Sequence, residues 1–118
     1  MTYQSYEDLE VWRKAYKLSV SIYRHLEDCR DYGLKDQMTR AGVSIASNIA
    51  EGAERGSIAE FIRFLHIAKG SAAELRTQLY IACEINVISE PDNKKLIEET
   101  VSISKMLQAL IKSLKSKK

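Results

Sequence analysis

The sequence contains a single proline, Pro91, and only five glycines among its 118 residues. Proline interrupts helices and glycine weakens them, so a chain this poor in both has few positions at which a helix must end. No segment alternates apolar and polar residues with a period of two, and we therefore expect no strands. The length suits one domain and is too short for two, and we assign residues 1–118 to a single domain.

Cysteine is also scarce. Cys29 and Cys83 are too few for a disulfide framework, and neither belongs to a C-x-x-C pair. No apolar run follows a basic start at the N-terminus, and no stretch approaches the roughly 20 apolar residues that a membrane span requires. We therefore expect a cytoplasmic protein that makes no membrane contact.

Residues with catalytic or metal-binding chemistry are not clustered. His25 and His66 stand alone, and neither belongs to an H-x-x-x-H or E-x-x-H pair. The segment from Gly52 to Gly56 has two glycines but lacks the strand and the spacing of a phosphate-binding loop. We therefore expect no catalytic residues, no bound metal and no cofactor, and we do not expect an enzyme.

What the chain does contain is apolar residues at helical spacing. The pattern predicts helices over about residues 6–29, 34–51 and 57–86, and a fourth that starts after Ser89. Ser57 and Glu60 form a capping box at the start of the third helix, and Ser89 can cap the fourth. Gly52 stands where a left-handed residue would close the second helix. Short connections between long amphipathic helices predict an antiparallel, up-down-up-down four-helix bundle.

The first predicted helix carries two apolar rows. Leu9, Tyr16 and Tyr23 recur every seven residues beside Trp12, and we interpret this row as core. The alternative is that these aromatic rings are platforms on which nucleic-acid bases stack. The second row consists of Val11, Ala15, Leu18 and Ile22.

The third predicted helix is apolar over more than one face. Its extra apolar residues are Ile62, Ile67, Ala73, Ile81, Cys83 and Ile85. A monomeric bundle would leave such surface exposed, which soluble proteins avoid. We therefore expect a homo-oligomer, built on the second apolar rows of the first and third helices.

Two sets of polar residues are candidates for sites. Asn48 and Glu51 predict a structural polar network that holds the second helix to the third, with Arg40 or Arg63 as the partner of the carboxylate. The alternative is a carboxylate that acts as a base or a ligand.

The second set lies in the basic C-terminal end, about residues 112–118. It contains four lysines that can neutralise phosphates: Lys112, Lys115, Lys117 and Lys118. The alternative for these lysines is a solvated tail. Arg55, near the middle of the chain, is a further candidate nucleic-acid contact.

The centre of the chain has a distinctive ordered set of residues. It comprises Ser47-Asn48-Ile49-Ala50-Glu51-Gly52, Arg55, Ser57, Glu60-Phe61-Ile62-Arg63-Phe64-Leu65, Ala68, Gly70-Ser71, Glu74-Leu75 and Thr77-Gln78-Leu79, with Asp8-Leu9 and Val11-Trp12 upstream. This set resembles the bacterial four-helix-bundle family of the 23S rRNA intervening-sequence proteins, from about residue 6 to residue 114. The resemblance implies a ring-shaped homopentamer. It also implies that some members are encoded within large ribosomal RNA genes, and that distant relatives bind a reverse transcriptase and nucleic acid in diversity-generating retroelements.

Composition, spacing and resemblance together lead to one functional hypothesis. The chain is expected to be a non-enzymatic homopentameric scaffold that binds structured RNA or an RNA-associated protein, which would include the ribosome, through basic surface. The alternative is a protein-binding adaptor, or a subunit like the retroelement accessory proteins, that makes no nucleic-acid contact.

Overall fold

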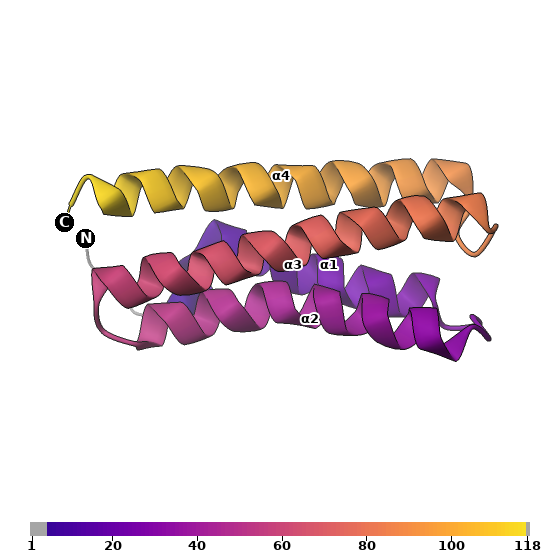
Figure 1. Ribbon diagram of the computed structural model, residues 1–118, viewed down its shortest axis with the longest axis horizontal. Coiled ribbons are helices and arrows are strands. Elements are labelled where there is room, and N and C mark those ends of the chain that lie inside the picture. The colour runs from indigo at the N-terminus through magenta and orange to yellow at the C-terminus, as the bar shows by residue number, and fades with distance from the viewer. Residues whose placement is uncertain (1–4, 118) are drawn as a thin grey trace.

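The computed structural model describes residues 5–117, in which four long helices pack side by side in antiparallel order (Figure 1). A short 3-10 turn precedes them, and the elements are η1 (Tyr6–Asp8), α1 (Glu10–His25), α2 (Tyr32–Glu54), α3 (Ile58–Glu84) and α4 (Glu90–Lys115). No strand occurs in this part of the chain. The all-α four-helix fold predicted from the sequence is confirmed. None of the helices within residues 5–117 is long and apolar enough to cross a membrane.

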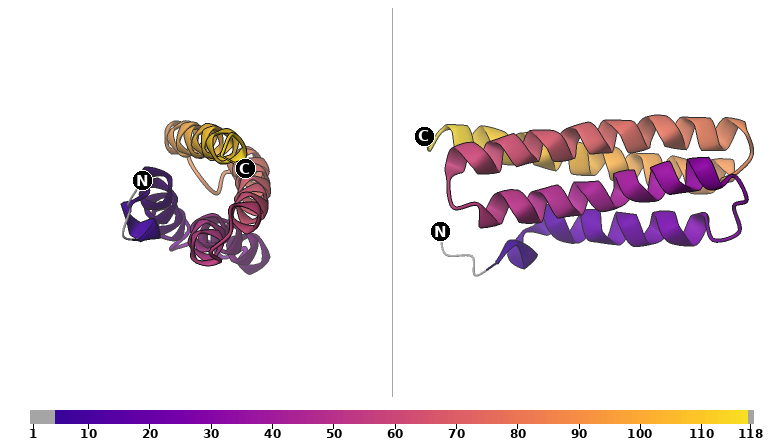
Figure 2. Two further views of the ribbon diagram at one scale, coloured as in Figure 1. Left: turned by 90° about the vertical axis from the view of Figure 1, so that its left-hand side faces the viewer. Right: turned by 60° about the horizontal axis from the view of Figure 1, so that its bottom comes forward.

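Each helix packs against two neighbours. The helix α1 lies against α2 and α4, and α3 lies against α2 and α4, so the four helices surround one core (Figure 2). The bundle measures 45 × 19 × 19 Å along its principal axes. Because the number of antiparallel helices is even, Ser5, Lys117 and the α2–α3 connection lie at one end of it, here called the open end (Figure 1). The α1–α2 and α3–α4 connections lie at the opposite end.

The predicted helix starts are confirmed where a side chain caps them. The Ser57 hydroxyl accepts a hydrogen bond from the Glu60 backbone N–H at 3.1 Å, and the Ser89 hydroxyl accepts one from Asp92 N–H at 3.4 Å. Each cap satisfies a backbone donor that the first turn leaves without a helical acceptor. At the start of the chain the prediction differs, because Ser5 caps the short turn η1 and α1 begins only at Glu10.

Two predicted helix ends are wrong. The first helix ends at His25 and not near Cys29, and the Asp31 carboxylate instead caps α2 by accepting a hydrogen bond from Leu34 N–H at 3.1 Å. Gly52 does not close α2, which continues to Glu54. The left-handed residue of this connection is Gly56, whose φ angle is 85°.

The core of the bundle corrects the interpretation of the first helix. Tyr16 and Tyr23 are 52% and 51% exposed, although Leu9 and Trp12 of the same row are partly buried against the core, whereas the second row of α1 is buried. A buried tyrosine hydroxyl would need a hydrogen-bond partner among apolar side chains, which is a physical reason for this orientation. The second row is therefore core and is not available for contacts between copies.

The helix α3 keeps apolar surface beyond the core. Ile67, Ile81 and Ile85 are between 41% and 50% exposed, although Ile62 is buried. The three exposed isoleucines are separated by 14 and four residues, a spacing that places them on one face of the helix. This isoleucine row is the part of the predicted oligomer surface that the fold leaves accessible.

Candidate nucleic-acid interface

The basic residues predicted to contact nucleic acid gather at the open end of the bundle. Lys112 and Lys115 lie in the last turn of α4, Lys117 follows it, and all three are exposed. Lys118 lies outside the described residues. Arg55 follows the last residue of α2, and α2 ends at the same end of the bundle at which α4 ends (Figure 1). Two segments that are far apart in the sequence therefore present cations from one end.

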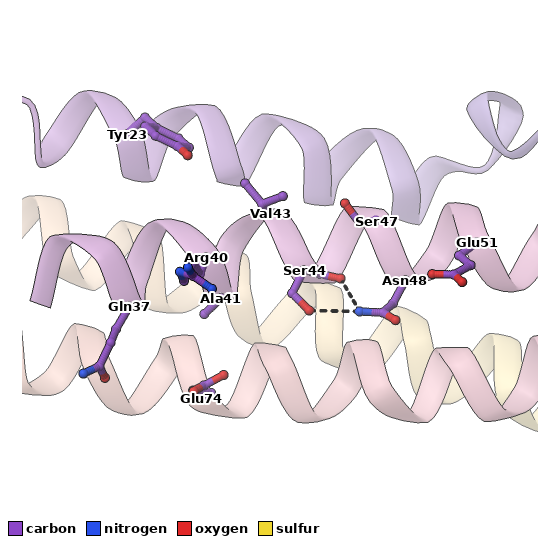
Figure 3. Close-up of a pocket in the computed structure, with 10 residues that line it drawn as sticks. All are labelled: Tyr23, Gln37, Arg40, Ala41, Val43, Ser44, Ser47, Asn48, Glu51 and Glu74. Carbon is purple, nitrogen blue, oxygen red and sulfur yellow. Dashed lines mark hydrogen bonds between the residues drawn. The ribbon is translucent and has the colours of Figure 1, made fainter. Parts of the chain in front are cut away.

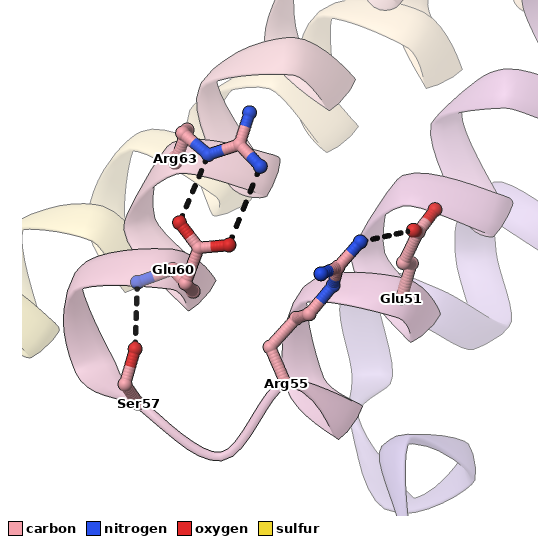
Figure 4. A network of polar contacts seen from close by, with 5 residues as sticks. All are labelled: Glu51, Arg55, Ser57, Glu60 and Arg63. Carbon is pink, nitrogen blue, oxygen red and sulfur yellow. Dashed lines mark hydrogen bonds and ion pairs between the residues drawn. The ribbon is translucent and has the colours of Figure 1, made fainter.

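Arg55 and Arg63 share an aromatic neighbour near this end. Their guanidinium carbons lie 4.9 and 4.6 Å from the centroid of the Phe64 ring. Each also has an acidic partner on its own helix: Arg55 donates to Glu51 at 2.8 Å, and Arg63 donates to Glu60 at 3.0 Å (Figure 4). The ring and the carboxylates hold both cations in defined positions at the surface.

The Glu60–Arg63 pair carries the resolved pKa shifts. Arg63 donates two hydrogen bonds to Glu60, at 3.0 and 3.3 Å. These hydrogen bonds, together with the positive charge of Arg63, hold the pKa of the Glu60 carboxyl below its ordinary value, although desolvation opposes the shift. The same contact with Glu60 raises the pKa of Arg63. Both groups are charged at neutral pH, and the pair is a surface feature.

A polar groove of about 620 Å³ runs along α2, between Tyr23 of α1 and Glu74 of α3 (Figure 3). Within it, Asn48 donates to the Ser44 carbonyl at 2.8 Å and to the Ser44 hydroxyl at 2.9 Å. The Ser44 hydroxyl lies 2.8 Å from the Ser71 hydroxyl of α3. These hydrogen bonds connect α2 to α3 through hydroxyl groups.

The predicted polar network is not a single buried cluster. Glu51 is exposed, and its ion-pair partner is Arg55 instead of Arg40 or Arg63. Arg40 pairs with Asp36 at 3.1 Å, and Arg63 pairs with Glu60. Each of these charged residues has an opposite charge three or four positions away on its own helix, which is the spacing at which helical neighbours meet. The hydrogen bond between α2 and α3 is made by Ser44 and Ser71, and Asn48 supports it by donating to Ser44.

A second groove, here called the aromatic groove, lies between α1 and α2 and encloses about 370 Å³. Its walls include Trp12, Tyr16 and Tyr23. The Trp12 and Tyr16 rings are stacked with centroids 5.5 Å apart and an angle of 3° between their planes, and Tyr6 approaches Trp12 edge-on at 5.2 Å. This groove was not predicted from the sequence, because these rings were assigned to the core. One sequence signal points to an exposed face: each of the three wall residues is followed directly by a cation.

The histidines do not form a ligand set. The His25 ring Nδ1 lies 2.8 Å from the Ser21 carbonyl, and its Nε2 lies 3.8 Å from the Asp92 carboxylate of α4. His66 is exposed on α3. Over residues 5–117, no three His, Cys, Asp or Glu side chains gather closely enough to hold a metal ion.

Comparisons with known proteins agree with this architecture. The model of the family described as "23S rRNA-intervening sequence protein" matches residues 7–109. A crystal structure of a protein of unknown function from the S23 ribosomal protein family of Bacteroides thetaiotaomicron superposes with a TM-score of 0.81 at 28% identity, over 86% of this chain and 98% of that one. No curated protein matches the chain. Because the family match spans most of the sequence, the chain belongs to the 23S rRNA-intervening sequence protein family.

Proposed function

We propose that this chain is a non-enzymatic scaffold that self-associates and binds structured RNA through the open end of its bundle. The observation that carries the proposal is the gathering of Lys112, Lys115 and Lys117 with Arg55 at that end. Residues 112–117 hold three lysines and no acid. Phosphate groups are neutralised by such side chains without regard to sequence, which suits recognition of a folded RNA by its backbone.

Self-association supports RNA binding because it brings the basic ends of several copies into one assembly. The proposed contact is the isoleucine row Ile67, Ile81 and Ile85, whose apolar side chains are accessible on one face of α3. Copies arranged around a closed ring, five according to the family resemblance, would add the charges of their lysines into one field. The other surface expected to join copies, the second apolar row of α1, lies in the core and is not accessible to another copy.

The RNA contact is tested by deleting residues 115–118. The deletion removes three lysines, Lys115, Lys117 and Lys118, and no residue of the described core, so the bundle should stay folded. The slope of the logarithm of hairpin-RNA affinity against the logarithm of salt concentration should become shallower, by up to about 0.9 for each deleted lysine that binds a phosphate in the parent. A matched control replaces Lys94 and Lys95 with glutamine near the start of α4, at the opposite end of the bundle. Equal affinities and equal slopes for the deletion and the parent would refute the contact.

Assembly is tested by sedimentation equilibrium of the parent and of an Ile81→Ser/Ile85→Ser double variant. Both side chains are about half exposed, so their replacement should spare the fold and weaken association. A parent that is monomeric at micromolar concentration would refute self-association. The second candidate function is a protein-binding adaptor, because an exposed apolar face is also suited to a partner helix. This candidate would be favoured if the double variant fails to assemble and the parent binds no RNA.

A further inference from the structure

We infer that the aromatic groove between α1 and α2 binds a single strand of nucleic acid, with bases stacked on the rings and phosphates held by an adjacent row of cations. The site is separate from the open-end lysines, and either contact can fail without the other.

Two parallel rows run along the exposed part of α1. Trp12, Tyr16 and Tyr23 form one row, and each is followed by a cation of the second row: Arg13, Lys17 and Arg24. Both rows have spacings of four and seven residues, so the members of each lie on one face, and the two rows are a single residue apart around the helix. The rows extend for roughly 16 Å along the helix axis, at about 1.5 Å per residue.

The aromatic row is prepared for stacking. Tyr16 already lies parallel to Trp12, with a 3° angle between the ring planes, and it remains 52% exposed. A base placed on the accessible surface of Tyr16 extends an existing stack without reorganising the rings. Tyr23 is 51% exposed and lies two helical turns further along, where it can receive another base.

The aromatic groove contains no carboxylate, although Tyr23 also lines the neighbouring polar groove, which contains Glu51 and Glu74. The α2 side is formed by small uncharged residues, namely Val43, Ala46, Ser47 and Ala50. None of the described residues that line the groove carries a carboxylate. The exposed hydroxyl group of Ser47 can exchange hydrogen bonds with base edges, and no carboxylate in the lining repels the phosphates of a strand that enters.

The cation row has the charge that such a ligand requires. Helix α1 contains Arg13, Lys14, Lys17 and Arg24 against a single acid, Glu10. Arg13 lies 3.8 Å from Asp8 and donates to the Glu7 carbonyl, which attaches η1 to α1 at one end of the groove. Arg24 is exposed and enters no ion pair within residues 5–117, so it is available to phosphates. Lys17 also enters no ion pair there, but it lines a separate groove between α1 and α4 that contains Glu98 and Glu99.

These features favour an unpaired strand over a duplex or a protein. In a duplex the bases are stacked on one another and cannot reach protein rings, whereas unpaired bases can be splayed onto them. A protein partner would be drawn to the apolar rings, but would not need an acid-free groove beside a row of cations. Stacking and phosphate contact do not distinguish RNA from DNA. The proposed ligand is therefore single-stranded nucleic acid of either kind.

The first experiment uses Trp12, the single tryptophan of the chain, as an internal probe. Oligouridine and oligodeoxythymidine of about twelve nucleotides should each quench its fluorescence, since single-strand binding sites on proteins cover about that length. Comparing the two oligonucleotides separates RNA binding from DNA binding. Tyr16→Ala should weaken binding roughly 5- to 150-fold, which corresponds to the loss of one stacked base. Tyr16→Phe keeps the ring and should retain the affinity. The matched control is Tyr80→Ala on α3, because Tyr80 is as exposed as Tyr23 but lies outside the groove.

The second experiment tests the cations. Arg24→Gln should make the salt dependence of oligouridine affinity shallower by about 0.7, the value for one phosphate contact on a single strand. Arg30→Gln removes the same charge from the α1–α2 connection and should leave the slope unchanged. Circular dichroism checks that every variant remains folded.

Three results would overturn the inference. The first is that neither oligonucleotide quenches Trp12. The second is that Tyr16→Ala binds as the parent does, whatever the deletion of residues 115–118 does to hairpin RNA. The third is that Tyr16→Ala changes the sedimentation of the protein and leaves oligonucleotide binding intact, which would make the groove an interface between copies.

Discussion

Gly52 of α2 lies against Phe64 of α3 so closely that a Cβ atom on residue 52 would stand 2.6 Å from the Phe64 Cβ. The Phe61 ring would be 3.2 Å away. Neither helix can accept that contact without moving, because a Cβ is fixed to its backbone. We expect Gly52→Ala to lower the free energy of unfolding by about 1–3 kcal/mol, as other overpacked cores do, and urea denaturation measures the change.

Gly70 provides the matched control for this substitution. It lies inside α3, and a Cβ built on it meets no other atom within 4 Å. Gly70→Ala should therefore raise the free energy of unfolding by about 0.5–1 kcal/mol, because alanine restricts the unfolded chain and favours the helix. Changes of the same sign in both variants would contradict the close approach of α2 and α3.

Asn48 and Glu51 should respond differently to truncation. Asn48→Ala removes two hydrogen bonds to Ser44 in a partly buried setting and should cost about 1 kcal/mol of stability. Glu51→Ala removes a carboxylate whose partner, Arg55, is itself exposed, and the effect should stay within about 0.5 kcal/mol. Thermal unfolding of the two variants distinguishes the cases. A larger loss for Glu51→Ala would restore the buried network that the sequence predicts.

The Glu60 carboxyl should titrate below the usual range for glutamate. Its folded-state pKa is lowered, so its contribution to stability is present above the unfolded pKa and is lost as the pH falls through the folded one. Carboxyl chemical shifts followed by NMR measure this pKa directly. Arg63→Gln should return it toward its ordinary value, because the largest cause of the shift is the hydrogen bond from Arg63. An unchanged titration in that variant would contradict the assignment.

Ile22 and Tyr23 are adjacent in α1 and test its register. Ile22 is fully buried, and Ile22→Ala should cost about 2–5 kcal/mol. Tyr23 is half exposed, and Tyr23→Ala should cost less than about 1 kcal/mol. The midpoints of urea unfolding give the comparison, and a reversed order would mean that the aromatic row belongs to the core after all.

Helix starts were predictable from the sequence because their cause is local. Ser57 and Ser89 each reach a backbone N–H only three residues further on, and no other part of the chain takes part. The fold class was predictable for a related reason, since apolar spacing and short connections both follow from neighbouring residues. The role of Asp31 was missed because it lies between two helices, where one residue can be assigned to either.

The orientation of α1 was not predictable from spacing alone. Tyr16 and Leu18 belong to rows that fit a buried helical face equally well, and the choice depends on the side chains that other helices bring to the centre. The expected partner of Glu51 was Arg40 or Arg63, and the actual partner, Arg55, was missed. Arg55 lies four residues after Glu51, a spacing at which helical neighbours meet, so this pair could have been predicted from the sequence.

The placement of Ser5 and Lys117 at one end of the bundle has a practical consequence for handling the protein. An affinity tag or a fusion partner at either terminus would stand beside the lysines and could mask them or compete with their ligand. The exposed residues 27 and 28 of the α1–α2 connection are at the far end of a bundle whose long axis is 45 Å. A fluorophore or a short epitope inserted there reports on the protein while leaving the other end unobstructed.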